Sequence, residues 1–291
     1  MERERFSILR AALRHLGQRR TDGRQTYTDA AVLAVYLWAV VNDRPTYWAC
    51  KPSNWPPGLR RGPLPSQSCM SRRLRSEAVC RLLARLERCL AAPARAPAIL
   101  TVVDGKALVI PMHSRDPDSG KGRGIGSTAR GYKIHAMIDA GGRPVGWKLT
   151  ALNEDERLVA CDLIARMPQG AYIVGDKLYD TNRLHAAAVG RGMQLIAQRR
   201  YGSDRGLGHI RQHGGRLRSK QLLEENLSGF GREMLRRRRS IERYFAWLTN
   251  YAGGLTSLHP WVRRKHRVEM WVRAKIAIAY VKTGKWVPFT A

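Results

Sequence analysis

The order of strand-like and helix-like patterns after residue 98 constrains the fold of this 291-residue chain most strongly. Short apolar or alternating runs predict four early strands, at residues 99–103, 107–110, 132–138 and 145–149. Three neighbouring strands joined by short connections are expected among them, and these would form an antiparallel meander. A helical pattern at 156–167 is followed by a strand, a helix and a strand, at 171–174, 184–189 and 193–197. Such alternation favours parallel pairing, so we expect an α/β domain with a mixed sheet flanked by helices.

Antiparallel strands followed by parallel ones are typical of the ribonuclease-H-like fold, which we expect for residues 99–291. The remaining part of that domain is predicted to contain a basic loop at 201–231 and two helices, at 232–251 and 263–282. The loop is rich in Gly, Arg and His, whereas both helices carry apolar residues at helical spacing.

The first 98 residues are expected to form a separate helical domain. Apolar residues recur at helical spacing over 5–16 and 30–41, and Thr28 or Asp29 can cap the second of these helices. A loop rich in proline follows at 51–65, and a small-residue, proline-containing connector at 91–98 ends the domain.

Residues 66–74 resemble the second helix of a helix-turn-helix, which would make residues 1–98 a DNA-binding region. Three arginines in this stretch or directly after it would then be available for phosphates or bases: Arg72, Arg73 and Arg75. The alternative is an ordinary amphipathic helix with a solvated arginine face, which any basic protein can contain.

The charge balance points to a polyanionic partner. The chain has 52 Lys and Arg residues against 23 Asp and Glu residues, for a formal net charge of +29. Such a surplus repels itself in a compact state, and nucleic acid is the usual partner that neutralises it. An RNA binder of the ribosomal kind, or merely an arginine-rich composition, is the alternative interpretation.

Cysteine spacing and apolar run length suggest where the protein works. The five cysteines form no CxxC pair, so neither a zinc finger nor a disulfide scaffold is indicated. The longest apolar run, at 30–41, is too short to cross a bilayer, and the N-terminus has no apolar signal core. We therefore expect a cytoplasmic, nucleoid-associated protein with no membrane partner.

Three acids stand at positions from which they can meet. Asp104 ends the apolar run at 99–103, and Asp176 follows the strand at 171–174 after one glycine. Carboxylates at the carboxyl ends of adjacent buried strands project at one rim of the sheet. Glu242 lies one position past the core residue of its helix, from which its longer side chain can reach the same rim. These residues are the candidate catalytic site.

Three carboxylates in a small space repel one another unless a cation joins them. Mg²⁺ accepts oxygen ligands and suits this set, with Mn²⁺ as a substitute, whereas an oxygen-only set disfavours zinc. Two such ions, roughly 3.5–4 Å apart, would activate the attacking oxygen and stabilise the leaving oxygen in phosphoryl transfer.

Each acid also has a plainer interpretation. The pair Asp104-Gly105 is a hairpin-turn signal between two apolar runs. Asp176 can be a turn residue, and Glu242 can form a surface ion pair with Arg238 four residues earlier. The order of the three on strand, strand and helix favours the metal site.

Arginines surround Glu242 on its helix. A helix that carries both acid and base can hold a metal and a phosphate together, so we expect a phosphate clamp here. Its members would be Arg238, Arg239 and Arg243, and Arg238 lies one turn before Glu242 on the same face. The alternative is a solvated basic face.

Four segments in the same order carry a resemblance to a known family: VVDGKAL, GYKIHAMIDAGGRPVGWKLTALNEDE, YIVGDKLYDTNRL and RRRRSIERYFAWL. They resemble bacterial insertion-sequence transposases of the DDE class, most closely the insertion-sequence four and five groups with a compact catalytic domain. The resemblance covers roughly residues 99–280. It implies a ribonuclease-H-like core in which Asp104, Asp176 and Glu242 bind the metal.

The resemblance also implies roles for further residues. DNA contact is implied for Lys133 and His135 in the strand motif, and for Arg238 before the glutamate. Supporting roles are implied for four others: Asn153, Asp155, Tyr179 and Asp180. The family's fuller signature has tyrosine and lysine where this chain has Leu235 and Thr249, so no role is carried to those positions.

The predicted activity is that of a DNA transposase. It would hydrolyse a strand at the element end and use the freed 3′-hydroxyl to attack target DNA. Its partners would be double-stranded DNA with terminal inverted repeats, the target DNA and, by family analogy, a second copy of the chain assembled on DNA. The alternatives are a DNA-binding protein without catalysis and a ribonuclease-H-like nuclease that acts on RNA–DNA hybrids.

Overall fold

The structure, a computed structural model, describes residues 1–16, 26–60, 62–91, 99–124, 126–167, 170–200, 210–225, 229–252, 255 and 257–282. Contacts divide the chain into two compact units. The helical unit comprises Met1–Ala92, Arg115–Asp118 and Trp247–Ala291, and the α/β unit comprises Pro93–Ser114 and Ser119–Ala246. The sequence predicts the last helix within the domain at 99–291, whereas contacts group it with the N-terminal helices.

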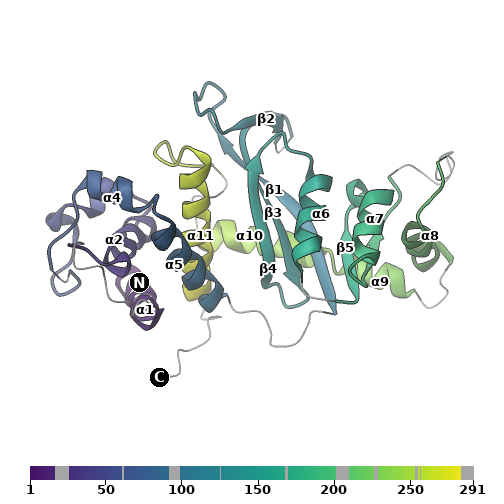
Figure 1. Ribbon diagram of the computed structural model, residues 1–291, viewed down its shortest axis with the longest axis horizontal. Helices are drawn as coiled ribbons and strands as arrows, with labels where there is room; N and C mark the ends of the chain where they lie inside the picture. The colour runs from purple at the N-terminus through teal and green to yellow at the C-terminus, as the bar shows by residue number, and fades with distance from the viewer. Residues whose placement is uncertain are drawn as a thin grey trace. The chain divides into compact units, whose positions relative to one another are not determined.

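The helical unit consists of short and long helices (Figure 1): α1 (Glu2–Leu16), α2 (Asp29–Val41), α3 (Thr46–Ala49), η1 (Pro52–Asn54), α4 (Gln67–Arg73), α5 (Glu77–Leu90), η5 (Leu248–Ala252) and α11 (Lys265–Lys282). Thr28 caps α2 by accepting a hydrogen bond from the backbone N–H of Ala31 at 3.0 Å. Among the described helices, none combines the length and apolarity that crossing a membrane requires.

Helix α11 lies in the core of the helical unit and contacts α5, α1 and α2. Its Trp271, Ala274 and Ile278 are buried, as the helical spacing predicts. Arg273 of α11 also pairs with the buried Glu87 of α5 at 2.7 Å. Because the buried charge has its partner, this pair joins the two helices without leaving an uncompensated carboxylate.

The α/β unit contains a mixed sheet with helices on both faces. Its elements are β1 (Leu100–Ile110), β2 (Gly120–Arg123), β3 (Thr128–Asp139), β4 (Pro144–Ala151), α6 (Glu156–Arg166), β5 (Tyr172–Gly175), η2 (Lys177–Tyr179), α7 (Asn182–Val189), β6 (Gln194–Ala197), α8 (Gly214–Lys220), η4 (Gln221–Glu225), α9 (Phe230–Arg236) and α10 (Arg239–Trp247).

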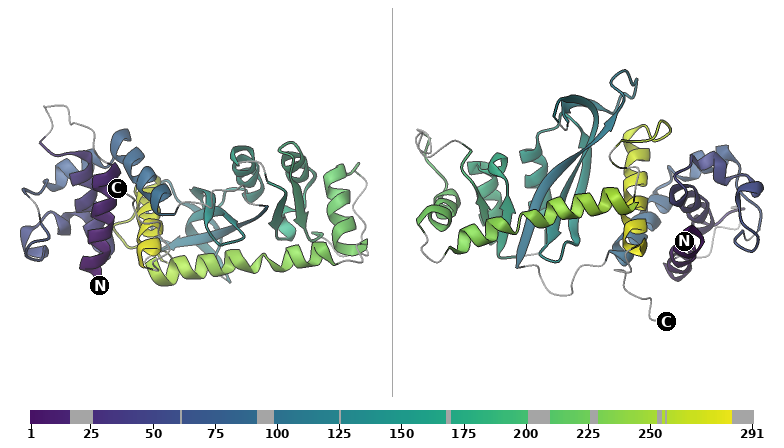
Figure 2. Two further views of the ribbon diagram at one scale, coloured as in Figure 1. Left: turned by 90° about the horizontal axis from the view of Figure 1, so that it is seen from below. Right: turned by 180° about the vertical axis from the view of Figure 1, so that it is seen from behind.

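The sheet has the order β2-β3-β1-β5-β6, and β4 also pairs with β3. Strands β1 to β4 pair antiparallel, whereas β5 is parallel to both β1 and β6. Helices α6 and α7 lie on one face, and α9 and α10 lie on the other (Figure 2). The α/β class and the mixed sheet are therefore confirmed, and the arrangement is consistent with a ribonuclease-H-like domain.

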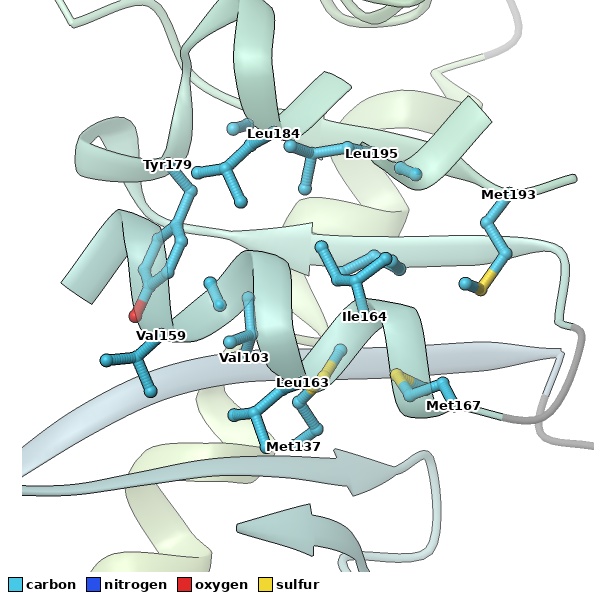
Figure 3. Close-up of a cluster of buried hydrophobic side chains, with 14 residues drawn as sticks. Val103, Met137, Val159, Leu163, Ile164, Met167, Tyr179, Leu184, Met193 and Leu195 are labelled. Atoms are coloured by element: carbon cyan, nitrogen blue, oxygen red, sulfur yellow. The ribbon is translucent and has the colours of Figure 1, made fainter. Parts of the chain in front are cut away.

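A hydrophobic core fixes the α6 and α7 face to the sheet. Figure 3 shows Val103 and Met137 of the sheet gathered with Val159, Leu163 and Leu184 of the two helices. All five side chains are at most 7% exposed. The backbone of β1 and the N-terminus of α6 are thereby held beside each other at the edge where the candidate acids lie.

Strand β1 corrects one prediction. The sequence predicts two strands, at 99–103 and 107–110, but the structure has one strand that runs through Asp104 and Gly105. Asp104 pairs with Ala136 and Gly105 pairs with His135, both in β3. Because β3 supplies a continuous antiparallel partner, the backbone groups at this point are paired without a turn.

Other elements differ from the pattern-based expectation. Strand β2 and the short helix α3 carry no clear periodic signal, and α8 with η4 occupies part of the predicted loop at 201–231, of which residues 201–209 and 226–228 lie outside the described residues. The helix predicted at 232–251 is divided into α9, α10 and the π-helical η5, with a turn at Arg237 and Arg238. Arg238, which contacts two of the candidate acids, lies in this turn.

Candidate active site

Asp104 and Asp176 occupy equivalent positions on neighbouring parallel strands. The register between β1 and β5 ends with Val102 opposite Val174. Continued by two residues, the same register sets Asp104 opposite Asp176, immediately after β5 ends. Asp176 caps η2 by accepting a hydrogen bond from the backbone N–H of Leu178 at 2.7 Å. The two aspartates therefore lie close together at one edge of the sheet.

The surroundings of Asp104 disfavour its ionised form. Burial is the largest cause and, together with the charges of Asp176 and Glu156, it raises the pKa of Asp104 from 3.8 to about 6. The backbone N–H of Gly105, 2.8 Å from Oδ1, and the charge of Arg238 act in the opposite direction. A carboxylate held in this state is a favourable ligand for an added cation.

Arg238 connects Asp104 to Glu242. Its Nη2 lies 2.7 Å from Oε1 of Glu242, and its Nη1 lies 3.7 Å from Oδ2 of Asp104. Glu242 follows the fully buried Ile241, and its own side chain is 55% exposed. The ion pair between Arg238 and Glu242 was the plainer interpretation of this glutamate, and the structure contains it.

The residues fit a divalent cation by their chemistry. Asp104, Asp176 and Glu242 offer only oxygen donors, and the negative charge of Asp104 is disfavoured by burial and by the neighbouring charge of Asp176. Over the ranges that the structure describes, no group of three or more His, Cys, Asp and Glu residues is arranged to hold a metal ion. The two aspartates thus lie near each other. Glu242 is connected to Asp104 by the guanidinium of Arg238, which contacts both carboxylates.

Glu156 is a further acid of the site that the sequence analysis missed. It is the first residue of α6, and its Oε1 lies 2.5 Å from Nζ of Lys133. The hydroxyl of Tyr179 donates to its Oε2 at 3.4 Å. Burial raises the pKa of Tyr179 well above its usual value, and the charges of Glu156, Asp104 and Asp176 add to this effect. These groups therefore form one electrostatic cluster.

A sequence signal for Glu156 exists but is ambiguous. Three acids follow one another at 154–156 in a chain with few acids. Asp155 is the N-cap of α6, and its carboxylate pairs with Arg157 at 2.6 Å, so it serves the helix start. The sequence alone does not tell which of three consecutive acids faces the sheet.

Two residues predicted to contact DNA lie inside the α/β unit. Lys133 is bound by Glu156, and its side chain is only 12% exposed. His135 is buried, and its Nε2 lies 2.8 Å from Oγ1 of Thr150. Burial is the largest cause and, together with the charges of Lys133 and Lys148, it lowers the pKa of His135 to about 3, so this imidazole is neutral at pH 7. Both residues link strands β3, β4 and α6 in this structure.

Two residues with predicted supporting roles, Asp180 and Asn153, contact neighbouring parts of the α/β unit. Asp180 is buried and accepts hydrogen bonds from Arg216 at 2.8 and 2.6 Å, and it lies 3.2 Å from His185. Burial alone would raise the pKa of Asp180, but the hydrogen bonds from His185 and Arg216 outweigh it and lower the pKa to about 2. Asn153 lies against Gly120, where any side chain on β2 would collide with its carboxamide.

The predicted clamp arginines other than Arg238 are accessible. Arg239 and Arg243 are exposed on α10. In the helical unit, Arg72 and Arg75 are exposed, whereas Arg73 pairs with Asp29 at 2.6 Å and donates to the carbonyl oxygen of Tyr27. The guanidinium of Arg73 thus stabilises the junction of α2 and α4.

The fold and the site are consistent with a phosphoryl-transfer domain that holds its acids at the edge of a mixed sheet. A family model described as Transposase DDE domain matches residues 95–281. The chain belongs to this family, whose members are transposases that catalyse phosphoryl transfer on DNA and generally use divalent metals. No curated protein matches the chain significantly.

Proposed function

We propose that the protein cleaves a DNA strand at the end of a mobile element and joins the freed 3′-hydroxyl to target DNA. Asp104, Asp176 and Glu242 would bind the Mg²⁺ ions of this reaction. The observation that carries the proposal is the register of β1 and β5, which, continued by two residues, sets two aspartates opposite each other just after β5 ends. The raised pKa of Asp104 supports a cation as the missing partner.

The residues have distinct tasks in this proposal. When bound, Mg²⁺ would supply positive charge to the phosphate oxygens and lower the pKa of the attacking hydroxyl or water. Asp104 and Asp176 would hold it from the rigid sheet, where their backbone is fixed by strand pairing. Glu242 would complete the set from α10 after exchanging its contact with Arg238.

Arg238 is suited to bind the scissile phosphate. It already bridges two of the three acids, so displacement from Glu242 would leave a guanidinium within reach of both the metal ligands and an anionic substrate. Arg239 and Arg243 are exposed on the same helix and would follow the DNA backbone. The partners would be DNA with terminal inverted repeats, target DNA and a second copy of the chain.

The test is strand cleavage and joining in vitro. Purified protein would be given duplex DNA carrying the inverted repeats that flank its gene, with Mg²⁺, Mn²⁺ or EDTA. We expect metal-dependent nicking and joining by the wild type, and neither by Asp104→Asn, Asp176→Asn or Glu242→Gln. Asp162→Asn, which replaces an exposed aspartate paired with Lys148, serves as the matched control.

Different outcomes separate the alternatives. Tight DNA binding without any cleavage would favour a DNA-binding protein that has lost catalysis. Cleavage of RNA–DNA hybrids in preference to duplex DNA would favour a nuclease of the same fold. Full activity of Asp104→Asn would exclude the proposed metal site.

A further inference from the structure

The helical unit contains a pocket that the proposed reaction does not use. Its volume is about 190 Å³, whereas a single water needs only about 10–15 Å³ of such space. The walls come from the residues around α3, from α4 and the turn after it, and from residues 261–262 with the first turns of α11. The pocket can therefore hold a ligand considerably larger than water.

One part of the wall is cationic. Arg44, Arg75 and Arg267 all line the pocket and are exposed, and no Asp or Glu is among the described residues that line it. Within the described part of the chain, the side chains of Arg44 and Arg267 form no hydrogen bond or ion pair. Arg75 is oriented by Ser71, whose carbonyl and hydroxyl oxygens accept at 3.0 and 2.9 Å. Three exposed guanidinium groups without a carboxylate among the described lining residues favour an anionic ligand.

The other part of the wall is aromatic. Tyr47 is 49% exposed, which is unusual for so large a side chain, and Trp261 and Trp271 also line the pocket. The ring of Trp261 stacks on His259 with centroids 4.5 Å apart and an interplanar angle of 6°. Its indole N–H is buried and has no acceptor among the residues described. This wall offers a flat apolar surface.

An internal ion network holds the two walls together. Lys275 is 1% exposed, and its Nζ lies 2.5 Å from Oδ1 of Asp43 and 5.0 Å from the ring centroid of Trp271. Asp43 has a φ of 51°, a left-handed conformation that is uncommon outside glycine, and it directly precedes Arg44. The strained backbone and the buried lysine thus fix where Arg44 enters the pocket.

We propose that this pocket, the Arg–aromatic pocket, binds one nucleotide of the bound DNA with its base out of the helical stack. The phosphate would contact Arg44, Arg75 and Arg267, and the base would lie against the aromatic wall. Arginines that follow the backbone, together with aromatic rings that stack a base, are the combination used to hold unpaired nucleotides. The inference rests on the proposed function in that DNA is the ligand.

The experiment compares two fluorescein-labelled probes without metal, namely a short blunt duplex and the same duplex with a single-stranded 3′ extension. The pocket variants are Arg44→Ala, Arg267→Ala and Tyr47→Ala, which replace exposed side chains. Arg81→Ala, on the exposed face of α5, removes the same charge elsewhere and is the control. Thermal melts followed by circular dichroism check that each variant is folded.

We expect each pocket variant to weaken binding of the extended probe at least about fivefold relative to its effect on the blunt probe, as loss of a stacked base or its phosphate requires. Arg44→Ala and Arg267→Ala should also reduce the salt dependence by about 0.7 per lost phosphate contact. Arg81→Ala should affect both probes alike.

Two results would overturn the inference. The first is that folded pocket variants bind both probes as Arg81→Ala does. The second is an equal loss on both probes, which would mean general phosphate attraction without a bound nucleotide. Metal-dependent cleavage tests the proposed function separately. If the wild type cleaves DNA but the pocket variants keep its probe selectivity, only the pocket is refuted. If the pocket variants lose probe selectivity but the wild type does not cleave DNA, only the proposed reaction is refuted.

Discussion

Replacing Asp104 by asparagine should stabilise the metal-free protein while abolishing its metal response. Burial is the largest cause of the raised pKa of this residue, and the charges of Asp176 and Glu156 act in the same direction. The ionised carboxylate is therefore less favourable in the folded state than in the unfolded chain. Asparagine keeps the shape and can still accept the hydrogen bond from Gly105, but it carries no charge.

The size of the effect follows from the pKa. A rise from 3.8 to about 6 corresponds to about 3 kcal/mol, at 1.36 kcal/mol per pKa unit. Because the folded-state pKa is the higher one, the stability contribution is fully present below pH 4 and is lost as the pH rises through 6. The wild type should thus be less stable than Asp104→Asn by up to about 3 kcal/mol at pH 8, and equal to it near pH 4.

The assay is urea denaturation in EDTA at a series of pH values from 4 to 8. Wild type and Asp104→Asn are compared at each pH, so that effects of the other titrating groups cancel. Asp162→Asn is the control, because Lys148 lowers the pKa of Asp162 and its loss should destabilise slightly above pH 4. Added Mg²⁺ should then stabilise the wild type and leave Asp104→Asn unchanged.

The reasoning fails if Asp104→Asn is no more stable than the wild type at pH 8 in EDTA. It also fails if the difference between them does not grow between pH 4 and pH 7, because a packing effect would be independent of pH. An equal Mg²⁺ response in both proteins would remove Asp104 from the metal site.

Three further substitutions test other contacts. Glu156→Gln breaks the charged contact with Lys133 and should cost about 1–3 kcal/mol in urea denaturation and reduce cleavage, while DNA affinity in a filter-binding assay is unchanged. Asp43→Ala removes the carboxylate from the buried Lys275 and should cost about 3–5 kcal/mol, most of which Lys275→Met should restore in a double-mutant cycle. Gly131→Ala should cost more than about 2 kcal/mol in a thermal melt, because Gly131 has a φ of 154° and its added Cβ would collide with the backbone of β1.

Periodic patterns were sufficient to predict the elements that place the acids. The strands at β3, β5 and β6 and the helices α6 and α7 all follow from spacing, because each buries one face against the same core. The parallel pairing of β1 with β5 follows from the intervening helix, and with it the proximity of Asp104 and Asp176. Sequence periodicity is informative here because it reflects which side chains are buried, and burial determines both the spacing of apolar residues and the pairing of the strands.

The remaining features depend on contacts between distant residues. Gly105 looks like a turn residue locally, and only the full length of β3 keeps it in a strand. Glu156 is one of three consecutive acids, and only the positions of Lys133 and Tyr179 distinguish it from its neighbours. The inclusion of α11 in the helical unit likewise depends on its pairing with α5, which no local pattern specifies.

The contacts of Arg238 are compatible with both interpretations of Glu242, as a surface ion pair and as a metal ligand. As a surface ion pair, its contact with the 55% exposed Glu242 is worth little, roughly 0–1 kcal/mol. The same guanidinium also lowers the pKa of Asp104, whose charge is disfavoured by burial. A weak contact is easily exchanged, so an arriving cation can take over the neutralisation of Asp104 and Glu242 and release Arg238 toward a phosphate. In the proposed function, the ion pair would be the resting form of the metal site. Arg238→Ala should then increase Mg²⁺ affinity in calorimetry while weakening DNA binding; reduced Mg²⁺ affinity would contradict the exchange.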